Sequence, residues 1–239
     1  MRVAWLVLVV SACGGQPPSE ETPAEPAAQE PRRPEAEPPR QPAEPPALRS
    51  GAFAFTPTPP RSATIRDDER GSYALVVGLG GDPAAAARTR AGELSGRAAD
   101  DLARGVRAAD RALRRLAEAG SDARAAFASL AFDGATARVV RGGDVRVWRL
   151  RGGTLEEWNE GEAPPLGEGE APVARHDVRP GDVVVLSAPG VHHYLDEIAM
   201  VRVLATGDDD PEAMARRLVQ ESADHTSERT HAAVVVRVE

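Results

Sequence analysis

A proline-rich segment near the N-terminus limits what this chain can fold into. Eleven of the 21 prolines lie between Pro17 and Pro46, in a stretch otherwise made mainly of Glu, Ala and Gln. Proline has no backbone N–H donor, and the stretch has too few large apolar side chains to bury a core. We therefore expect residues 13–50 to form an extended tether and residues 51–239 to form one folded domain.

The residues before the tether are typical of a secretion signal. Arg2 precedes the apolar run Val3 to Val10, and small residues lead to Cys13, the only cysteine. The run is much shorter than the roughly 20 residues that a membrane-spanning helix needs. VSAC resembles the bacterial lipobox, which implies a signal peptide at 1–12 and a lipid on Cys13. The alternative is a buried N-terminal strand with an incidental cysteine.

The lipobox resemblance also implies a location. The protein would be a membrane-anchored lipoprotein of the cell envelope, facing the periplasm or the cell exterior. The net charge is −8, which argues against a nucleic-acid partner because phosphate binding needs a basic face. We expect the membrane, through the lipid, and a protein partner that the sequence does not identify.

Apolar periodicity divides the folded part into strands and helices. Asp133-Gly134 between two apolar runs indicates a hairpin. The expected strands are 51–55, 62–66, 73–77, 125–132, 135–141, 144–150, 182–186 and 232–238. The expected helices are one or two within 83–119, then 194–205 and 211–223, with a loop at 160–179. This order predicts an α+β layered fold with a mostly antiparallel sheet.

Four stretches of the sequence, in the right order, resemble the motifs of PPM-type (type 2C) metal-dependent serine/threonine protein phosphatases. They are SYALVVGLGGD, GGDVRVWRLRGGTLEEW, RPGDVVVLSAPGV and DPEAMARRLVQESADHTSERTHAAVVVRV. The resemblance covers residues 61–239. It implies a β-sandwich flanked by helices, and a reaction that uses two Mn²⁺ or Mg²⁺ ions held by aspartates.

The resemblance also implies which residues stand at the metal-binding positions. The aspartate of the family's D-G-x-G-G-H motif falls on Val77, and its histidine falls on Asp82. The aspartate of S-D-G falls on Pro189. The closing aspartate and asparagine fall on Arg229 and Thr230, or on Glu228 and Arg229 if the alignment shifts by one residue. The glycines that shape these loops are retained as Gly78, Gly80, Gly81 and Gly190.

Some carboxylates remain. The family's G-D-S-R motif keeps Gly143, Asp144 and Arg146, and its aspartate serves a weaker third metal. The N-E-D motif corresponds loosely to Asp67-Asp68-Glu69. Val and Pro cannot coordinate a hard cation, and Arg carries a fixed positive charge. We therefore expect no metal cofactor, with Asp144 and Asp82 as possible remnant ligands and Mn or Mg required if the protein is active.

Other polar residues have simple structural interpretations. Asp144 is expected to cap a Gly-Gly-Asp bend. The pair His192-His193 could suggest zinc, but no Cys or further local His completes a tetrahedral set, so we expect a solvated pair at a helix start. His225 and His231 are expected on the surface, and Trp148 and Trp158 within the sheet packing. The GLGGD loop could also hold a phosphate through backbone N–H groups.

Three functions remain open from the sequence. The first is a pseudophosphatase that serves as a binding or regulatory module. The second is an active metal-dependent phosphatase in which Asp67, Asp68, Glu69, Asp82 and Asp144 form a rearranged cluster. The third is a structural envelope lipoprotein that shares only the fold, because a fold does not specify a function.

Overall fold

The computed structural model describes the folded part of the chain. The described residues are 46–55, 62–79, 101–118, 122, 124–158, 161, 163–166, 168, 171–205, 210–226 and 228–239. The predicted signal peptide, Cys13 and most of the tether lie outside them, as do Gly80, Gly81 and Asp82. Among the described helices, none is both long and apolar enough to cross a membrane.

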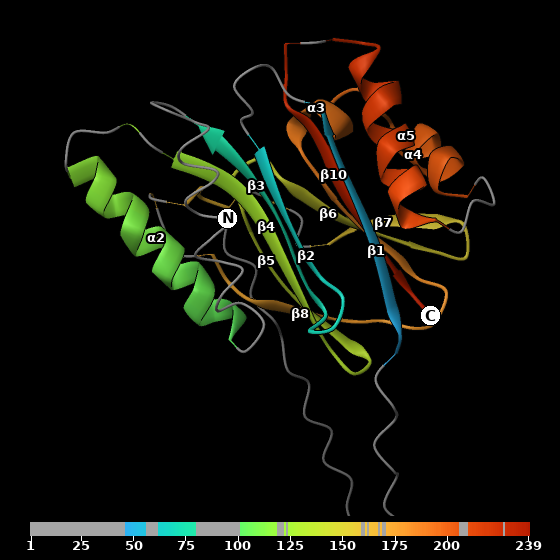
Figure 1. Ribbon diagram of the computed structural model, residues 1–239, viewed down its shortest axis with the longest axis horizontal. Coiled ribbons are helices and arrows are strands. Elements are labelled where there is room, and N and C mark those ends of the chain that lie inside the picture. The colour runs from blue at the N-terminus through green and yellow to red at the C-terminus, as the bar shows by residue number, and fades with distance from the viewer. Residues whose placement is uncertain are drawn as a thin grey trace, which may run out of the picture. The chain divides into compact units, whose positions relative to one another are not determined.

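Two antiparallel five-stranded sheets pack face to face (Figure 1). The first sheet has the order β1 (Leu48–Phe55), β10 (His231–Val238), β9 (Val183–Ser187), β6 (Arg146–Arg151) and β7 (Thr154–Trp158). The second has the order β2 (Ser62–Asp67), β3 (Ser72–Leu79), β4 (Arg124–Asp133), β5 (Thr136–Gly142) and β8 (Ala174–Asp177). The α+β sandwich predicted from the sequence is confirmed.

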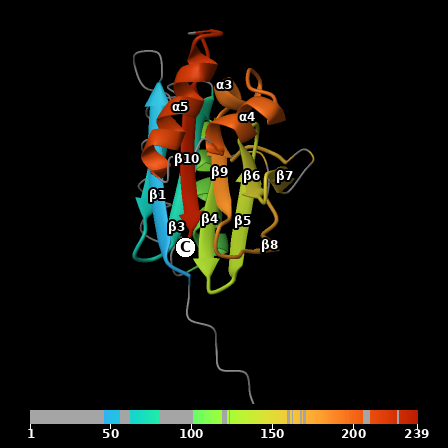
Figure 2. The same cartoon turned by 90° about the vertical axis from the view of Figure 1, so that its right-hand side faces the viewer.

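Helices cover the outer faces of both sheets. α2 (Leu102–Glu118) packs on the second sheet, where its Leu102, Val106 and Leu113 join one buried cluster with Phe127 and Val140. α4 (Glu197–Leu204) and α5 (Pro211–Ala223) cover the first sheet, as Figure 2 shows from the side of these helices. Each sheet therefore has two covered faces.

This layering explains the uninterrupted apolar runs in the sequence. Successive side chains of a strand point to opposite faces. In β3, Tyr73, Leu75 and Val77 enter the cluster between the sheets, whereas Ala74 and Val76 join the cluster beneath α2. A strand that is buried on both faces has no polar alternation, as YALVV shows.

Most predicted strands agree with the structure to within three residues. Asp133 ends β4 and Gly134 begins the turn to β5, as predicted, and α5 has the predicted bounds. β1 begins at Leu48, before the predicted domain start at residue 51. The region 160–179 is not entirely a loop, because it contains β8. Its sequence, ARHD, has no buried residue and therefore no apolar signal.

The helix predicted at 194–205 corresponds to the shorter α4, and a separate short helix that the sequence did not predict precedes it. α3 (Pro189–His192) follows β9 directly, and α4 begins only at Glu197. The Asp196 side chain separates them, because it accepts a hydrogen bond from the Ala199 N–H at 2.8 Å and so caps α4.

Gly51 should be essential for the contact between β1 and α5. A Cβ atom at this position would collide with the backbone of Pro211 and Glu212 at the start of α5. We expect Gly51→Ala to lower the free energy of unfolding by about 1–3 kcal/mol, the usual range for overpacking. Chemical denaturation measures the change. Ala54→Ser, at an exposed position of β1, is the control, and equal stability of the two variants would contradict this packing.

Candidate functional site

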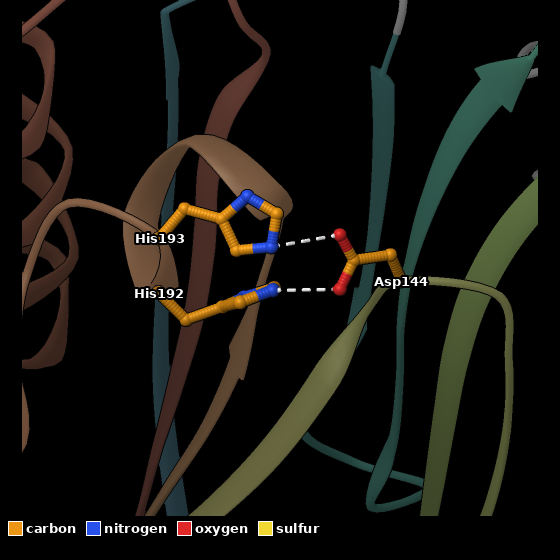
Figure 3. Close-up of side chains that lie close together, drawn as sticks. All are labelled: Asp144, His192 and His193. Carbon is orange, nitrogen blue, oxygen red and sulfur yellow. Dashed lines mark hydrogen bonds and ion pairs between the residues drawn. The ribbon is translucent and has the colours of Figure 1, made fainter. Parts of the chain in front are cut away.

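Two turns that are far apart in the sequence meet at one end of the sandwich. Asp144 lies in the turn that carries the chain from β5 in the second sheet to β6 in the first. The turn requires Gly143, whose φ is +65° and where a Cβ would lie 2.8 Å from the Ala126 Cβ. The second turn is α3, which presents His192 and His193 toward Asp144 (Figure 3).

The backbone holds α3 tightly against β10. The Gly190 N–H donates to the Thr230 carbonyl at 3.0 Å, and the Ala188 N–H donates to the Ala232 carbonyl at 2.9 Å. A Cβ at Gly190 would collide with the Thr230 carbonyl and lie 2.8 Å from the His231 ring. The glycine that follows Pro189 is therefore needed for this close approach.

Both oxygens of Asp144 are bound by histidines. His192 Nε2 lies 3.0 Å from Oδ1, and His193 Nε2 lies 3.0 Å from Oδ2. His192 Nδ1 lies 3.0 Å from the Ser187 hydroxyl, which accepts a hydrogen bond from the Trp148 indole N–H at 3.0 Å.

The partners define which nitrogen of each ring carries its proton. Because Arg229 only donates, at 2.8 Å, His193 Nδ1 must accept and Nε2 carries the proton. The hydroxyl of Ser187, which already receives the Trp148 N–H, donates to His192 Nδ1. Both imidazoles are therefore neutral. His192 donates to the ionised carboxylate, and His193 Nε2 lies 3.0 Å from its other oxygen.

Burial and hydrogen bonding shift the pKa values in this group. Burial lowers the pKa of His192 to about 4, although Asp144 acts in the opposite direction. Burial alone would raise the pKa of Asp144, but the hydrogen bond from His192 and the nearby His193 and Arg146 lower it below its usual value. The neutral histidine and the ionised carboxylate are thus the stable forms at neutral pH.

Ser187, His192 and Asp144 do not form a nucleophilic triad. Ser187 is completely buried, and its hydroxyl is already engaged by Trp148 and His192. A nucleophile must reach the substrate, and no substrate atom could approach this oxygen. The arrangement therefore orients His192.

Cavities open on both sides of Asp144 and the two histidines. One, of about 690 Å³, is lined by His192 and His193 together with parts of α4 and α5. The other, of about 930 Å³, is lined by Asp144, Arg141, Arg146 and Glu157. In the second, Arg146 pairs with Glu157 at 3.0 Å, and burial lowers the pKa of Arg141. A ligand could therefore approach Asp144 from one side and the histidines from the other.

The structure places the other positions of the family motifs apart from this group or in different roles. Val77 is 4% exposed and belongs to the apolar cluster between the sheets, and Gly78 follows it in β3. Pro189 is the first residue of α3. Arg229 is exposed and bonds to His193, and Thr230 accepts from Gly190. Gly80, Gly81 and Asp82 lie outside the described residues.

Among the described residues, the carboxylates of the alternative cluster do not converge; Asp82, its other member, lies outside them. Asp67, Asp68 and Glu69 lie at the β2–β3 hairpin, where Asp68 accepts hydrogen bonds from Ser50 and Tyr73. Asp67 lies opposite Ser72 at the start of β3. Gly143, the neighbour of Asp144, packs on Ala126, which lies opposite Val77 near the other end of β3. At about 3.3 Å per residue, β3 separates these points by roughly 16 Å. Metal–oxygen bonds of about 2.0–2.6 Å cannot span that distance.

Two expectations for histidines were wrong. His192 is not a solvated residue, because its side chain is fully buried. His231 is not on the surface either: it is fully buried and lies 2.9 Å from the Ser222 hydroxyl, and burial lowers its pKa. The approach of Asp144 to the pair could not be read from a 48-residue separation. The only local signal was that both histidines follow a buried strand within a few residues.

Comparisons with known proteins agree with the fold and its order of motifs. The model of the family described as Stage II sporulation protein E (SpoIIE) matches residues 76–237. This chain belongs to the SpoIIE family. No curated protein matches the sequence of this SpoIIE-family chain.

Solved structures of PPM phosphatases share the fold of this SpoIIE-family chain. PppA, a key regulatory component of T6SS in Pseudomonas aeruginosa, has a TM-score of 0.73 at 22% identity, covering 80% of this chain and 98% of PppA. The catalytic domain of the phosphatase PstP in complex with two manganese ions has a TM-score of 0.72 at 19% identity, with 80% and 98% covered. PstP/Ppp of Mycobacterium tuberculosis gives 0.70 at 18%, with 80% and 99% covered. The chain thus carries a PPM-type phosphatase-like domain, as its motifs predict.

The depressed pKa of His192 makes the stability of this SpoIIE-family domain dependent on pH. Between pH 6.5, the ordinary pKa of histidine, and about pH 4, His192 binds a proton in the unfolded chain but not in the folded one. The contribution of neutral His192 to the free energy of unfolding is therefore fully present above pH 6.5, and it is lost as the pH decreases toward 4. The loss should reach about 3 kcal/mol for a shift of this size.

We test this with His192→Gln, which removes the titrating group. Its free energy of unfolding should fall less than that of the wild type between pH 7 and pH 4, measured by urea denaturation at several pH values. The carboxyl of Asp144 changes the stability with pH only below its ordinary pKa of 3.8, which is outside this pH range. Parallel pH profiles for the two proteins would contradict the assignment.

Proposed function

We propose that this chain is a lipid-anchored envelope protein whose phosphatase-like domain binds a partner and does not hydrolyse phosphoesters. The observation that carries the proposal is the identity of the residues at the three motif positions where the resemblance expects metal-binding aspartates. They are Val77, Pro189 and Arg229.

The surroundings of these residues support the absence of the family's metal pair. Val77 faces the apolar cluster between the sheets, and neither its side chain nor that of Pro189 has an atom that could coordinate a hard cation. Arg229 brings a fixed positive charge to the loop before β10. Two dications about 3.5–4 Å apart need several anionic oxygens. The described residues at these positions supply none, so we assign no reaction step to such a pair.

The remaining carboxylate supports the same proposal. Asp144 keeps the motif position of a weaker metal ligand, but one of its oxygens already accepts a hydrogen bond from His192, and the other lies 3.0 Å from His193 Nε2. The two cavities beside it are large enough to receive a side chain or a phosphorylated group of a partner. PppA is described as a regulatory component, and a regulatory role for the present domain is compatible with the shared fold.

One prediction of this proposal concerns metal-dependent turnover. The full chain carrying Cys13→Ser, which cannot be acylated, should bind no pair of Mn²⁺ ions in calorimetry at millimolar metal. It should also hydrolyse p-nitrophenyl phosphate and a phosphothreonine peptide no faster than buffer, because it lacks the carboxylates that would neutralise two dications. PstP, run in parallel, is the positive control. Mn²⁺-dependent turnover that EDTA abolishes would overturn the proposal.

A separate prediction concerns the lipid anchor. In a bacterial host, the wild-type chain should incorporate labelled palmitate and sediment with membranes, whereas Cys13→Ser should do neither. The reason is that the acyl chains attach to the Cys13 sulfur, and two or more chains give stable anchoring. Ser11→Ala keeps a small residue before the cysteine and is the control. Membrane association that survives Cys13→Ser without label would refute the lipid anchor.

A further inference from the structure

Asp144, His192 and His193 place three metal-binding atoms at one point of the molecule. One atom from each residue lies within 4.8 Å of the others, and each histidine Nε2 is 3.0 Å from an Asp144 oxygen. Zinc bonds of about 2.0–2.2 Å put tetrahedral ligands about 3.3–3.5 Å apart. Small rotations of these side chains would therefore create the required spacing (Figure 3).

We propose that these three residues bind a single zinc-class divalent ion, whether or not the domain also binds a partner. The ligands are two imidazoles and one carboxylate, a set that suits Zn²⁺ and other late first-row ions, whereas Mg²⁺ and Mn²⁺ prefer oxygen. The site thus differs in ligand chemistry, in number of ions and in its residues from the two-metal site that the resemblance to PPM phosphatases implies.

The neighbouring residues orient the ligands for such an ion. Zinc-binding histidines usually have their second ring nitrogen fixed by a hydrogen bond. His192 has this arrangement, because the Ser187 hydroxyl lies 3.0 Å from Nδ1 and is itself fixed by the Trp148 indole. The His192 and His193 rings are perpendicular, with centroids 4.9 Å apart, so the two adjacent residues can both direct Nε2 toward Asp144.

The coordination would be open. Three protein ligands leave the fourth tetrahedral position of zinc to water, as in catalytic sites and unlike the closed four-ligand structural sites. The cavities beside the ligands provide the space for that water. The Asp144 and His193 side chains are 46% and 35% exposed, so an ion can enter from solvent.

Binding requires the histidine protons to move. The ion takes the Nε2 lone pairs, so each neutral imidazole transfers its proton through solvent from Nε2 to Nδ1. At His192 the new Nδ1–H can donate to the Ser187 oxygen. At His193 it would meet the Arg229 guanidinium, now 2.8 Å away, which has no acceptor. Arg229, an exposed residue, must therefore swing away, and it opposes the ion through its charge as well.

The experiment uses Co²⁺ and Zn²⁺ with the full chain carrying Cys13→Ser. Co²⁺ should produce the visible absorption bands of a tetrahedral site at one equivalent per chain, and Zn²⁺ should bleach them by displacement. Asp144→Asn and His193→Ala should each weaken Zn²⁺ binding by about tenfold or more. Arg229→Gln should tighten binding several-fold, because it removes both the guanidinium that the ion must displace and its positive charge.

A matched control variant distinguishes this site from ion binding elsewhere on the chain. His225→Ala removes an exposed histidine that lines the same cavity but is not a ligand, and should leave the affinity unchanged. Circular dichroism verifies that each variant is folded.

A one-equivalent Co²⁺ spectrum that Asp144→Asn and His193→Ala abolish supports the proposal. The absence of tetrahedral bands, or Zn²⁺ affinity that neither substitution changes, would overturn it. Mn²⁺-dependent turnover is a separate readout, so the two proposals can fail independently.

Discussion

The packing of the two sheets against each other is the constraint on which the rest of the structure depends. Alternate residues of both sheets form one buried apolar cluster, and helices seal the opposite faces. Burial of this apolar surface supplies the main driving force for folding. Val77 belongs to this cluster, so the strand end that the motif comparison assigns to a metal ligand contributes to the core instead.

The group around Asp144 links elements that the core alone would not connect. The turn between β5 and β6 passes from one sheet to the other, and α3 returns from β9 toward β10. The hydrogen bond from His192 to Asp144 and the 3.0 Å approach of His193 Nε2 to the other carboxylate oxygen join these two turns directly. A partly buried charge-assisted hydrogen bond such as that from His192 is stronger than a neutral one, so this contact holds the two turns together.

The sequence predicts those parts of the molecule in which local pattern and tertiary environment agree. The β4–β5 hairpin follows from Asp133-Gly134, and α5 begins with Asp210 and Pro211, which are good residues for a helix start. β8 could not be predicted, because its pairing with β5 is a long-range backbone interaction that needs no apolar side chain. The burial of His231 depends on Ser222 and Gly190, and the proximity of Asp144 to the histidine pair depends on the sheet-to-sheet turn. Neither leaves a periodic trace in the sequence.

Gly51 and Gly190 have a mechanical consequence. At Gly51 the start of α5 rests on the backbone of β1 with no side chain between them, and at Gly190 α3 rests on the Thr230 carbonyl and the His231 ring. Many proteins move by shear, in which a packed helix slides over its neighbour on a layer of side chains that change rotamer. Here that layer is missing beneath the start of α5, and beneath α3 it is the buried His231 ring, so sliding would drive backbone into backbone or into that ring. A ligand that displaces α3 must therefore either move the start of β10 with it or leave both in place.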